Sequence, residues 1–275
     1  MKEHGKSGAA AWAALFFSFC VTPLAGAEPL KTGGTGAATG TIQVLAEEYR
    51  REQPSFTLAV VDGLGSTGGI KAVTAGALDF ALVGRPLKAQ EQAAGLVELE
   101  YGRTPFVIVT NKEGVDNLSL VQLASLIAGD TPTWPDGSPV RLVLRPVADA
   151  DTELLGRFSP GVKEALAVAH KRGGMVRAIT DGESANESER LAGSLGTSSV
   201  ALLRSEKRAL RVLSVDGILP TPENFASGAY PHGKTMTIVT KGKPNEATQK
   251  FLDFMSSEKG RLVLVRLGHL MPRAP

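Results

Sequence analysis

The chain has 275 residues, a hydrophobic content of 43% and a formal net charge of +2 at pH 7. A chain of this length and apolar content can bury a sizeable core, which excludes disorder and fibrous structure and predicts one large or two moderate α/β lobes. Such a small net charge lacks the field that nucleic-acid and membrane-surface binders use. We therefore expect a small-molecule or protein partner and no nucleic acid.

Residues 1–27 have the pattern of a secretory signal peptide. Lys2 and Lys6 precede an apolar run that is too short for an ordinary membrane span, and the small residues 25–27 follow it. We expect cleavage near Ala27, a periplasmic location and no membrane insertion afterwards, the alternative being an uncleaved anchor. Cleavage would remove Cys20, the only cysteine, so the mature chain would have neither a disulfide nor a thiolate nucleophile.

The next segments alternate between helical and strand patterns. Residues 41–52 place Ile42, Leu45, Ala46 and Tyr49 on one helical face, and residues 57–63 have the pattern of a buried strand. Residues 68–79 then have apolar residues at helical spacing, and residues 80–84 form another strand-like run. This β-α-β-α order favours an α/β fold with helices on both faces of a sheet.

Two strand-like runs far apart in the chain have similar sequences. "RTPFVIVTN" covers residues 103–111 and "KTMTIVTKG" covers residues 234–242. They are our candidates for strands that cross between two lobes. In the last segment, Leu262, Val265 and Leu267 are expected to pack a final helix against its lobe.

The glycines Gly63, Gly65 and Gly68 match the spacing of a dinucleotide-binding loop. That motif needs an acidic residue about 20 positions later, and "LVGRPLKAQ" in this zone has none. No Gly-Lys-Ser/Thr ends the turn, so a Walker loop is also excluded. An anion cradle fits better, with the Ser66 hydroxyl and free backbone N–H groups opening a helix, although glycine and serine also make ordinary turns.

A second turn of this kind lies in "LKTGGTGAATGTIQVLAEEY", where a strand runs through a Gly/Thr-rich turn into a helix. The dipole of a helix favours negative charge at its N-terminus. Two helix starts that lie close to their strand ends therefore suggest one shared anion site.

Several blocks of the chain resemble the phosphate-binding proteins of bacterial ABC importers. They are "GGTGAATGTIQVLAEEYRRE", "GLGSTGGIKAVTAGALDFALVGRPLK", "VIVTNKEGVDNLSLVQLASLIAGDTPTW", "LSVDGILPTPENFASGAYPHGKTMTIVTKG" and "FLDFMSSEKGRLVLVRLGHLMP". The resemblance implies a type II periplasmic binding protein, with two α/β lobes joined by two crossing strands around a ligand cleft. It implies lobe 1 at residues 28–109 and 235–275 and lobe 2 at residues 110–234.

The resemblance also implies a ligand site for phosphate or a related oxyanion. In that family neutral donors at helix starts and one arginine hold the dehydrated anion, as buried anions require. Arg145 matches the arginine. The residues carried over to the site are Thr35, Gly36, Ala37, Ser66, Thr67, Gly84, Arg145, Asp149, Ala150 and Asp151.

Two positions depart from the family pattern. Gly84 stands where many phosphate binders have a carboxylate or serine that accepts the ligand's proton, and Asp149, Ala150 and Asp151 replace a Ser-Gly-Thr turn. Ionised carboxylates only accept hydrogen bonds, so they oppose an anion. Three interpretations stay open: Asp149 pairs with Arg145 and faces away, an aspartate accepts the ligand's proton, or the ligand is not phosphate. A one-residue slip that brings Thr152 into register would soften the objection.

Enzymatic interpretations are weak. The histidines have no zinc-like spacing, and "AGSLG" lacks the first glycine of a nucleophile elbow because Ala192 takes its place. The acidic run 181–189 lacks calcium-loop spacing and is expected to be a solvated surface. We therefore expect no catalysis, cofactor or metal. The resemblance implies instead a monomeric solute-binding protein that delivers phosphate or a similar oxyanion to an ABC permease. The alternative is a relative that has lost phosphate and acts as a sensor or scaffold through a protein partner.

Overall fold

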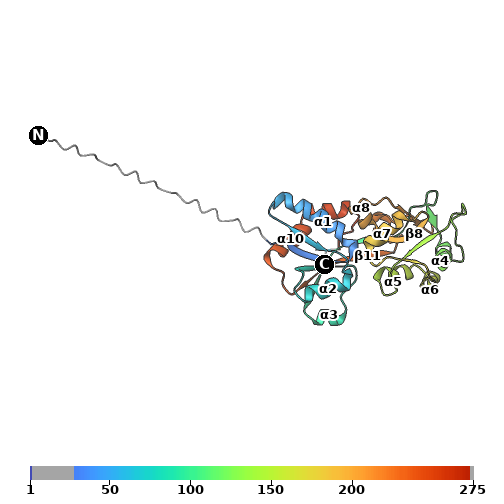
Figure 1. The fold of residues 1–275 in the computed structure, drawn as a ribbon, viewed down its shortest axis with the longest axis horizontal. Helices are drawn as coiled ribbons and strands as arrows, with labels where there is room; N and C mark the ends of the chain where they lie inside the picture. Colours follow the sequence, from blue (N-terminus) through green and yellow to red (C-terminus); the bar gives the residue numbers. More distant parts are fainter. Residues whose placement is uncertain (2–27, 273–275) are drawn as a thin grey trace.

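The computed structural model describes residue 1 and residues 28–272, in which two α/β lobes lie side by side (Figure 1). Residues 2–27, which include most of the predicted signal peptide, lie outside the described part. One continuous sheet passes through both lobes in the order β2-β1-β3-β11-β4-β8-β6-β7, and β9 pairs with β4 beside this path. The two-lobed α/β architecture that the resemblance implied is therefore confirmed.

Lobe 1 is built on parallel strands β1 (Leu30–Gly34), β2 (Leu58–Val61) and β3 (Phe80–Val83), with β11 (Gly233–Lys241) antiparallel to β3. Its helices are α1 (Gly36–Glu52), α2 (Gly65–Thr74), α3 (Ala89–Ala93), α10 (Glu246–Ser256) and α11 (Glu258–Arg266).

Both faces of the lobe 1 sheet are covered by helices, because side chains alternate along each strand. Phe80 and Leu82 of β3 pack in one core with α1 and α10, whereas Ala81 and Val83 pack in another with α2. All four apolar residues predicted for the buried face of α1 are buried. The prediction of a buried strand at 57–63 is wrong, since β2 is the outermost strand and Val61 is 43% exposed.

Lobe 2 contains the second half of β4 (Leu96–Thr110) and the strands β6 (Arg141–Leu144), β7 (Val176–Arg177), β8 (Ser194–Ser199) and β9 (Arg211–Val212). A small separate sheet pairs β5 (Asn117–Leu118) with β10 (Ser214–Val215). The helices are α4 (Leu120–Ala128), α5 (Ala150–Gly156), α6 (Pro160–Ala169), α7 (Asp181–Arg190), α8 (Val200–Ser205) and α9 (Pro222–Ser227).

The two lobes are joined where β4 leaves one core and enters the other. β4 pairs with β11 as far as Pro105 and with β8 from Phe106 onwards. At this point the backbone N–H of Phe106 donates a hydrogen bond of 3.1 Å to the carbonyl of His232, where the returning chain reaches β11. The two runs predicted to cross between lobes are thus found in β4 and β11, side by side. The exact lobe boundaries stay a prediction.

The C-terminal packing was predicted only in part. Leu267 is buried, but Leu262 and Val265 are 64% and 53% exposed, and the side chains that α11 buries are Val263 and Leu264. The helix is rotated about its axis relative to the predicted face. Among residues 28–272, no helix has the length and apolar content that crossing a membrane would require.

Gly34 is expected to be essential for the close pairing of the end of β1 with β3. Its φ is +143°, and an added Cβ would lie 1.9 Å from the carbonyl oxygen of Leu82. The substitution Gly34→Ala should lower the free energy of unfolding by about 3 kcal/mol or more, measured by urea denaturation, because backbone must move. Gly76→Ala is the matched control, since φ is +73° but no atom lies within 4 Å of the new Cβ. Gly76→Ala should lower the free energy of unfolding by only about 1 kcal/mol. Equal decreases for Gly34→Ala and Gly76→Ala would contradict the steric argument.

Candidate functional site

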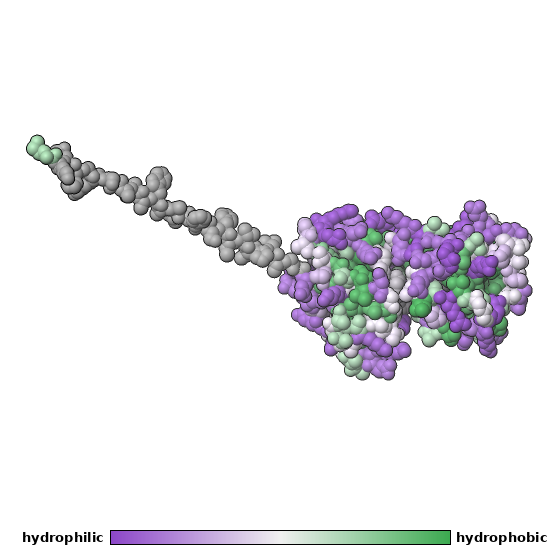
Figure 2. Space-filling view, viewed as in Figure 1, coloured by the Kyte–Doolittle hydropathy of each residue, from purple (hydrophilic) through white to green (hydrophobic). Residues whose placement is uncertain are grey.

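A cleft of about 420 Å³ lies between the two lobes. Figure 2 shows the surface indented where the lobes meet, on the side of α2 and α5. Lobe 1 lines it with the starts of α1 and α2, and lobe 2 lines it with the end of β6 and the start of α5. Its polar lining residues include Thr35, Ser66, Thr67, Arg85, Lys88, Arg145, Asp149, Asp151, Glu153, Asp181 and Lys234.

The start of α1 reaches this cleft through Thr35. Thr35 is the N-cap residue and is 5% exposed, and its backbone N–H is bonded to the carbonyl of Leu82 at 2.9 Å. Its hydroxyl donates to Oδ2 of Asp181 at 3.3 Å. Gly36 and Ala37 follow in the first turn, where backbone N–H groups have no acceptor within the helix. Neither residue is among those that line the cleft, and their donor role stays a prediction.

The start of α2 forms the second lobe 1 wall. Gly63 and Gly65 have φ of +77° and +62°, which makes the tight turn, and α2 begins at Gly65. Ser66 is therefore the second residue of α2, in the first turn of the helix. Its hydroxyl accepts a hydrogen bond of 3.1 Å from the backbone N–H of Gly84. Thr67 lies beside it in the cleft wall.

Gly84 lies between the donors of the two helices. A Cβ built there would be 3.5 Å from the Thr35 hydroxyl oxygen and 3.9 Å from that of Ser66. A longer side chain at this position would therefore reach the same space as an anion held by α1 and α2. Because Gly84 has no side chain, it places no proton-accepting group in this space.

Arg145 forms the charged wall on the lobe 2 side. It follows β6 and is only 6% exposed, in contrast to an ordinary strand-end arginine. Its guanidinium donates to both carboxylate oxygens of Asp149, at 3.3 and 2.8 Å, and to the carbonyl of Ala178 at 3.0 Å. A third carboxylate oxygen, Oδ2 of Asp181, lies 3.9 Å away.

Asp149 is the N-cap of α5 as well as the partner of Arg145. One of its oxygens accepts a hydrogen bond of 2.9 Å from the backbone N–H of Asp151, and its side chain is 23% exposed. Asp149 therefore pairs with Arg145 but still lines the cleft. Ala150 opens α5 beside it. The hydroxyl of Thr152 donates to the carbonyl of Pro146 at 2.8 Å, so Thr152 does not replace the missing donor turn.

A buried ion-pair cluster lies behind this wall, at the lobe junction. Nζ of Lys234, at the start of β11, is 2.5 Å from Oδ1 of Asp151 and 2.8 Å from Oδ1 of Asp181. The three side chains are 2%, 4% and 9% exposed. One ammonium group therefore serves two carboxylates from two different helices.

The pKa values of the two carboxyl groups that share Lys234 are shifted in opposite directions. Burial and the neighbouring charges of Asp181 and Asp149 outweigh Lys234 and raise the pKa of Asp151 to about 7. Burial also opposes ionisation of Asp181, but Lys234, Arg145 and the Thr35 hydroxyl outweigh it and lower the pKa of Asp181. For Lys234, burial is outweighed by the two carboxylates, which raise its pKa. Of the two carboxyl groups, Asp181 therefore favours the ionised form more strongly than Asp151 does.

Asp181 and Lys234 were missed by the sequence interpretation. The run 181–189 was expected to be solvated, and this is wrong because α7 buries Asp181, Ser184 and Ser188. Thr180 caps α7, so the Thr-Asp-Gly sequence carried a signal for a helix start with an acidic residue. For Lys234, the signal was a charge at the start of a crossing strand whose only other charged residue, Lys241, stands at its far end.

Nothing in the part of the chain that the structure describes gathers three or more His, Cys, Asp or Glu side chains in a metal-binding arrangement. The histidines of that part lie away from the cleft lining. His232 stacks on Phe158 with ring centroids 3.6 Å apart, and Nε2 of His269 lies 3.2 Å from the Thr41 hydroxyl. The cleft is lined by hydrogen-bond donors and by charged side chains that form ion pairs with one another.

The raised pKa of Asp151 predicts a pH-dependent stability. The folded-state pKa of about 7 exceeds the usual value of 3.8, so folding favours the protonated form. This contribution is complete below about pH 4 and is lost as the pH rises through about 7. The free energy of unfolding of the wild type, minus that of Asp151→Asn, should therefore fall between pH 5 and 8 in urea titrations. Glu164→Gln, on the exposed face of α6, should show no such trend; a difference for Asp151→Asn that rises with pH would contradict the assignment.

Lys234 should be the most costly side chain to remove from the cluster. Lys234→Met leaves two buried carboxylates without their cation and should cost about 3–5 kcal/mol in the free energy of unfolding. Adding Asp151→Asn and Asp181→Asn to Lys234→Met should recover part of this loss, because the unpaired charges are then gone. Urea denaturation of the single and triple variants measures this, and a triple variant less stable than the single one would overturn the electrostatic explanation.

Comparison with known proteins places the fold in a family. A family model described as a PBP superfamily domain matches residues 21–259. The phosphate-binding protein PstS of Bacillus subtilis is 27% identical over 241 residues, which are 83% of this chain and 75% of that protein.

Two solved structures share the architecture. A Clostridium perfringens protein, assigned as a phosphate ABC transporter substrate-binding protein and solved with bound phosphate, has 22% identity and a TM-score of 0.74, covering 90% of this chain and 100% of that chain. The periplasmic molybdate-binding protein of Azotobacter vinelandii has 16% identity and a TM-score of 0.61, covering 89% and 100%. The matched residues, the two lobes and the cleft between them show that the chain belongs to the PBP superfamily, with the type II periplasmic binding fold.

Proposed function

We propose that the protein is a non-catalytic, extracytoplasmic solute-binding protein that binds phosphate or a related tetrahedral oxyanion. The observation that carries this proposal is the meeting of the α1 and α2 starts with buried Arg145 at one cleft between lobes. Both helices run away from the cleft, so their dipoles favour an anion there. The PstS name of the Bacillus subtilis relative supports phosphate as the ligand.

In the proposed mechanism, lobe 1 contributes neutral donors and lobe 2 contributes the cation. The N–H groups of Gly36 and Ala37, with the hydroxyls of Ser66 and Thr67, would replace part of the anion's hydration shell. Arg145 would complete the shell from the other lobe. Because a bound anion contacts both lobes only when the cleft is closed, binding favours closure.

The acidic residues of the cleft oppose an anion unless each is compensated. At about 4 Å and an effective dielectric constant near 20, one like-charge pair costs roughly 4 kcal/mol. Asp149 is paired with Arg145, and Asp151 and Asp181 share Lys234, so the charges that face the ligand are largely neutralised. The molybdate-binding neighbour has the same fold, so the fold alone does not decide which oxyanion binds. That choice depends on the side chains of the cleft.

Delivery of the ligand to an ABC permease by a monomer exported through the N-terminal segment completes the proposal. The relatives described above carry the names of oxyanion binders, so they give no support to the alternative of a sensor or scaffold.

Calorimetric titration with phosphate and then sulfate tests the proposal. The protein would be purified after export and freed of carried-over ligand by unfolding and refolding. Phosphate should bind with micromolar or tighter affinity, and Ser66→Ala should weaken it about tenfold, the effect of one hydrogen bond of about 1.4 kcal/mol. Ser55→Ala, at an exposed serine before β2, is the control and should bind like the wild type. Absence of heat with both anions in the stripped wild type would overturn the proposed function.

A further inference from the structure

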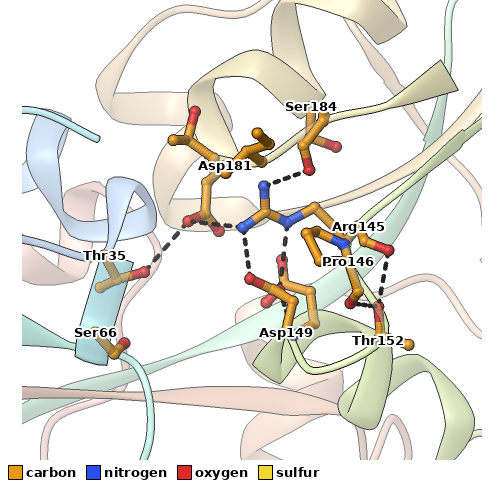
Figure 3. A network of polar contacts seen from close by, with 12 residues as sticks. Thr35, Ser66, Arg145, Pro146, Asp149, Thr152, Asp181 and Ser184 are labelled. Atoms are coloured by element: carbon orange, nitrogen blue, oxygen red, sulfur yellow. Dashed lines mark hydrogen bonds and ion pairs between the residues drawn. The ribbon is translucent and has the colours of Figure 1, made fainter. Parts of the chain in front are cut away.

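Asp181 reaches from lobe 2 to the donors of lobe 1. Figure 3 shows its carboxylate between the Thr35 hydroxyl and the Arg145 guanidinium, while Ser66 lies apart from this network. The hydrogen bond from Thr35 is 3.3 Å long and joins residues of different lobes, since Thr35 caps α1 and Asp181 opens α7. The side chain is 9% exposed, so it is a buried link between the lobes.

The same carboxylate lies directly in front of α1. A Cβ built on Gly36 would be 3.3 Å from Cβ and 3.4 Å from Oδ2 of Asp181. Gly36 begins α1, so the negative group lies at the positive end of this helix. On one side it meets Arg145, which the proposed function gives to the ligand, and on the other it meets Thr35, which the sequence predicts as a ligand-site residue.

We propose that the Asp181 carboxylate is a tethered occupant of the anion site, which holds the two lobes together in the empty protein and must be displaced from Thr35 and α1 by an entering oxyanion. This inference rests on the proposed function for the identity of the displacing ligand. The link between the lobes itself rests only on the contacts of Asp181.

Displacement follows from the chemistry of the two groups. A carboxylate and the unprotonated oxygens of an oxyanion both accept hydrogen bonds, so they compete for the Thr35 hydroxyl, and their negative charges repel each other at short range. Asp181 can leave Thr35 without becoming an isolated buried charge, because its other oxygen is bonded to Lys234 at 2.8 Å. Lys234 thus makes the exchange of one anion for another feasible.

The charge count of the cluster points the same way. Two cations, Arg145 and Lys234, face the three carboxyl groups of Asp149, Asp151 and Asp181. An added anion makes this cluster more negative, and it is Asp181 that contacts both cations and the lobe 1 donor. Asp181 is therefore the side chain that sets how strongly an oxyanion is held.

The test compares Asp181→Ala and the volume-conserving Asp181→Asn with Glu187→Gln, a control on the same helix whose carboxylate pairs with Arg190 near the protein surface. Phosphate titration by calorimetry should give at least tenfold tighter binding for Asp181→Ala than for the wild type, and an unchanged affinity for the control. An affinity of Asp181→Ala that is equal to or weaker than that of the wild type would overturn the displacement step. If Asp181→Ala does not fold, Asp181→Asn gives the same comparison.

Small-angle X-ray scattering tests the link between lobes independently of phosphate. The ligand-free wild type should already have the smaller radius of gyration of the closed form, and ligand-free Asp181→Ala should have a larger one. Equal radii for these two proteins, or an open ligand-free wild type, would overturn the link. If no variant gives heat with phosphate or sulfate, the proposed function fails, and a larger radius for Asp181→Ala would still support the link.

Discussion

The organisation of the cleft depends on the buried ion pairs that the Lys234 ammonium forms with Asp151 and Asp181. Lys234 lies where the chain returns from lobe 2 to lobe 1, and its ammonium holds Asp151 at the start of α5 and Asp181 at the start of α7. Desolvating three ionisable groups is costly, and close contacts among them repay this cost only when the geometry is good. The positions of α5 and α7 relative to β11 are therefore tied to one side chain.

The continuous sheet gives this cluster its place. β4 carries backbone pairing from one core to the other, with one register shift opposite Met236 and Thr237, so the two lobes share a strand while each retains its own helices. The starts of α1 and α2 come directly after β1 and the turn following β2, at the carboxyl ends of parallel strands. Ligand sites of open α/β sheets lie outside these strand ends, which is where the cleft is found.

The cleft combines features that favour an anion with features that oppose it. Helix starts and Arg145 attract negative charge, whereas three carboxyl groups compete for the same donors. The compensation is local: Asp149 caps α5 and pairs with Arg145, and the other two share Lys234. Such a site can discriminate among anions by their charge, because an entering anion must rearrange the ion pairs that already line the cleft.

The sequence by itself determined the α/β class, the buried face of α1 and the two crossing strands, because these depend on local periodicity and on short motifs. For most of the cleft wall, including Arg145 and Asp149, the sequence indicated residues only through its resemblance to a known family. It could not show that β2 is an edge strand or that α11 turns Leu262 to solvent, since each depends on which neighbour packs there. The partnership of Thr35, Asp181 and Lys234 was decided only by the tertiary structure. These residues are 53 to 146 positions apart in pairs that touch, and a carboxylate in an acidic run has the same local pattern whether it faces water or a buried ammonium.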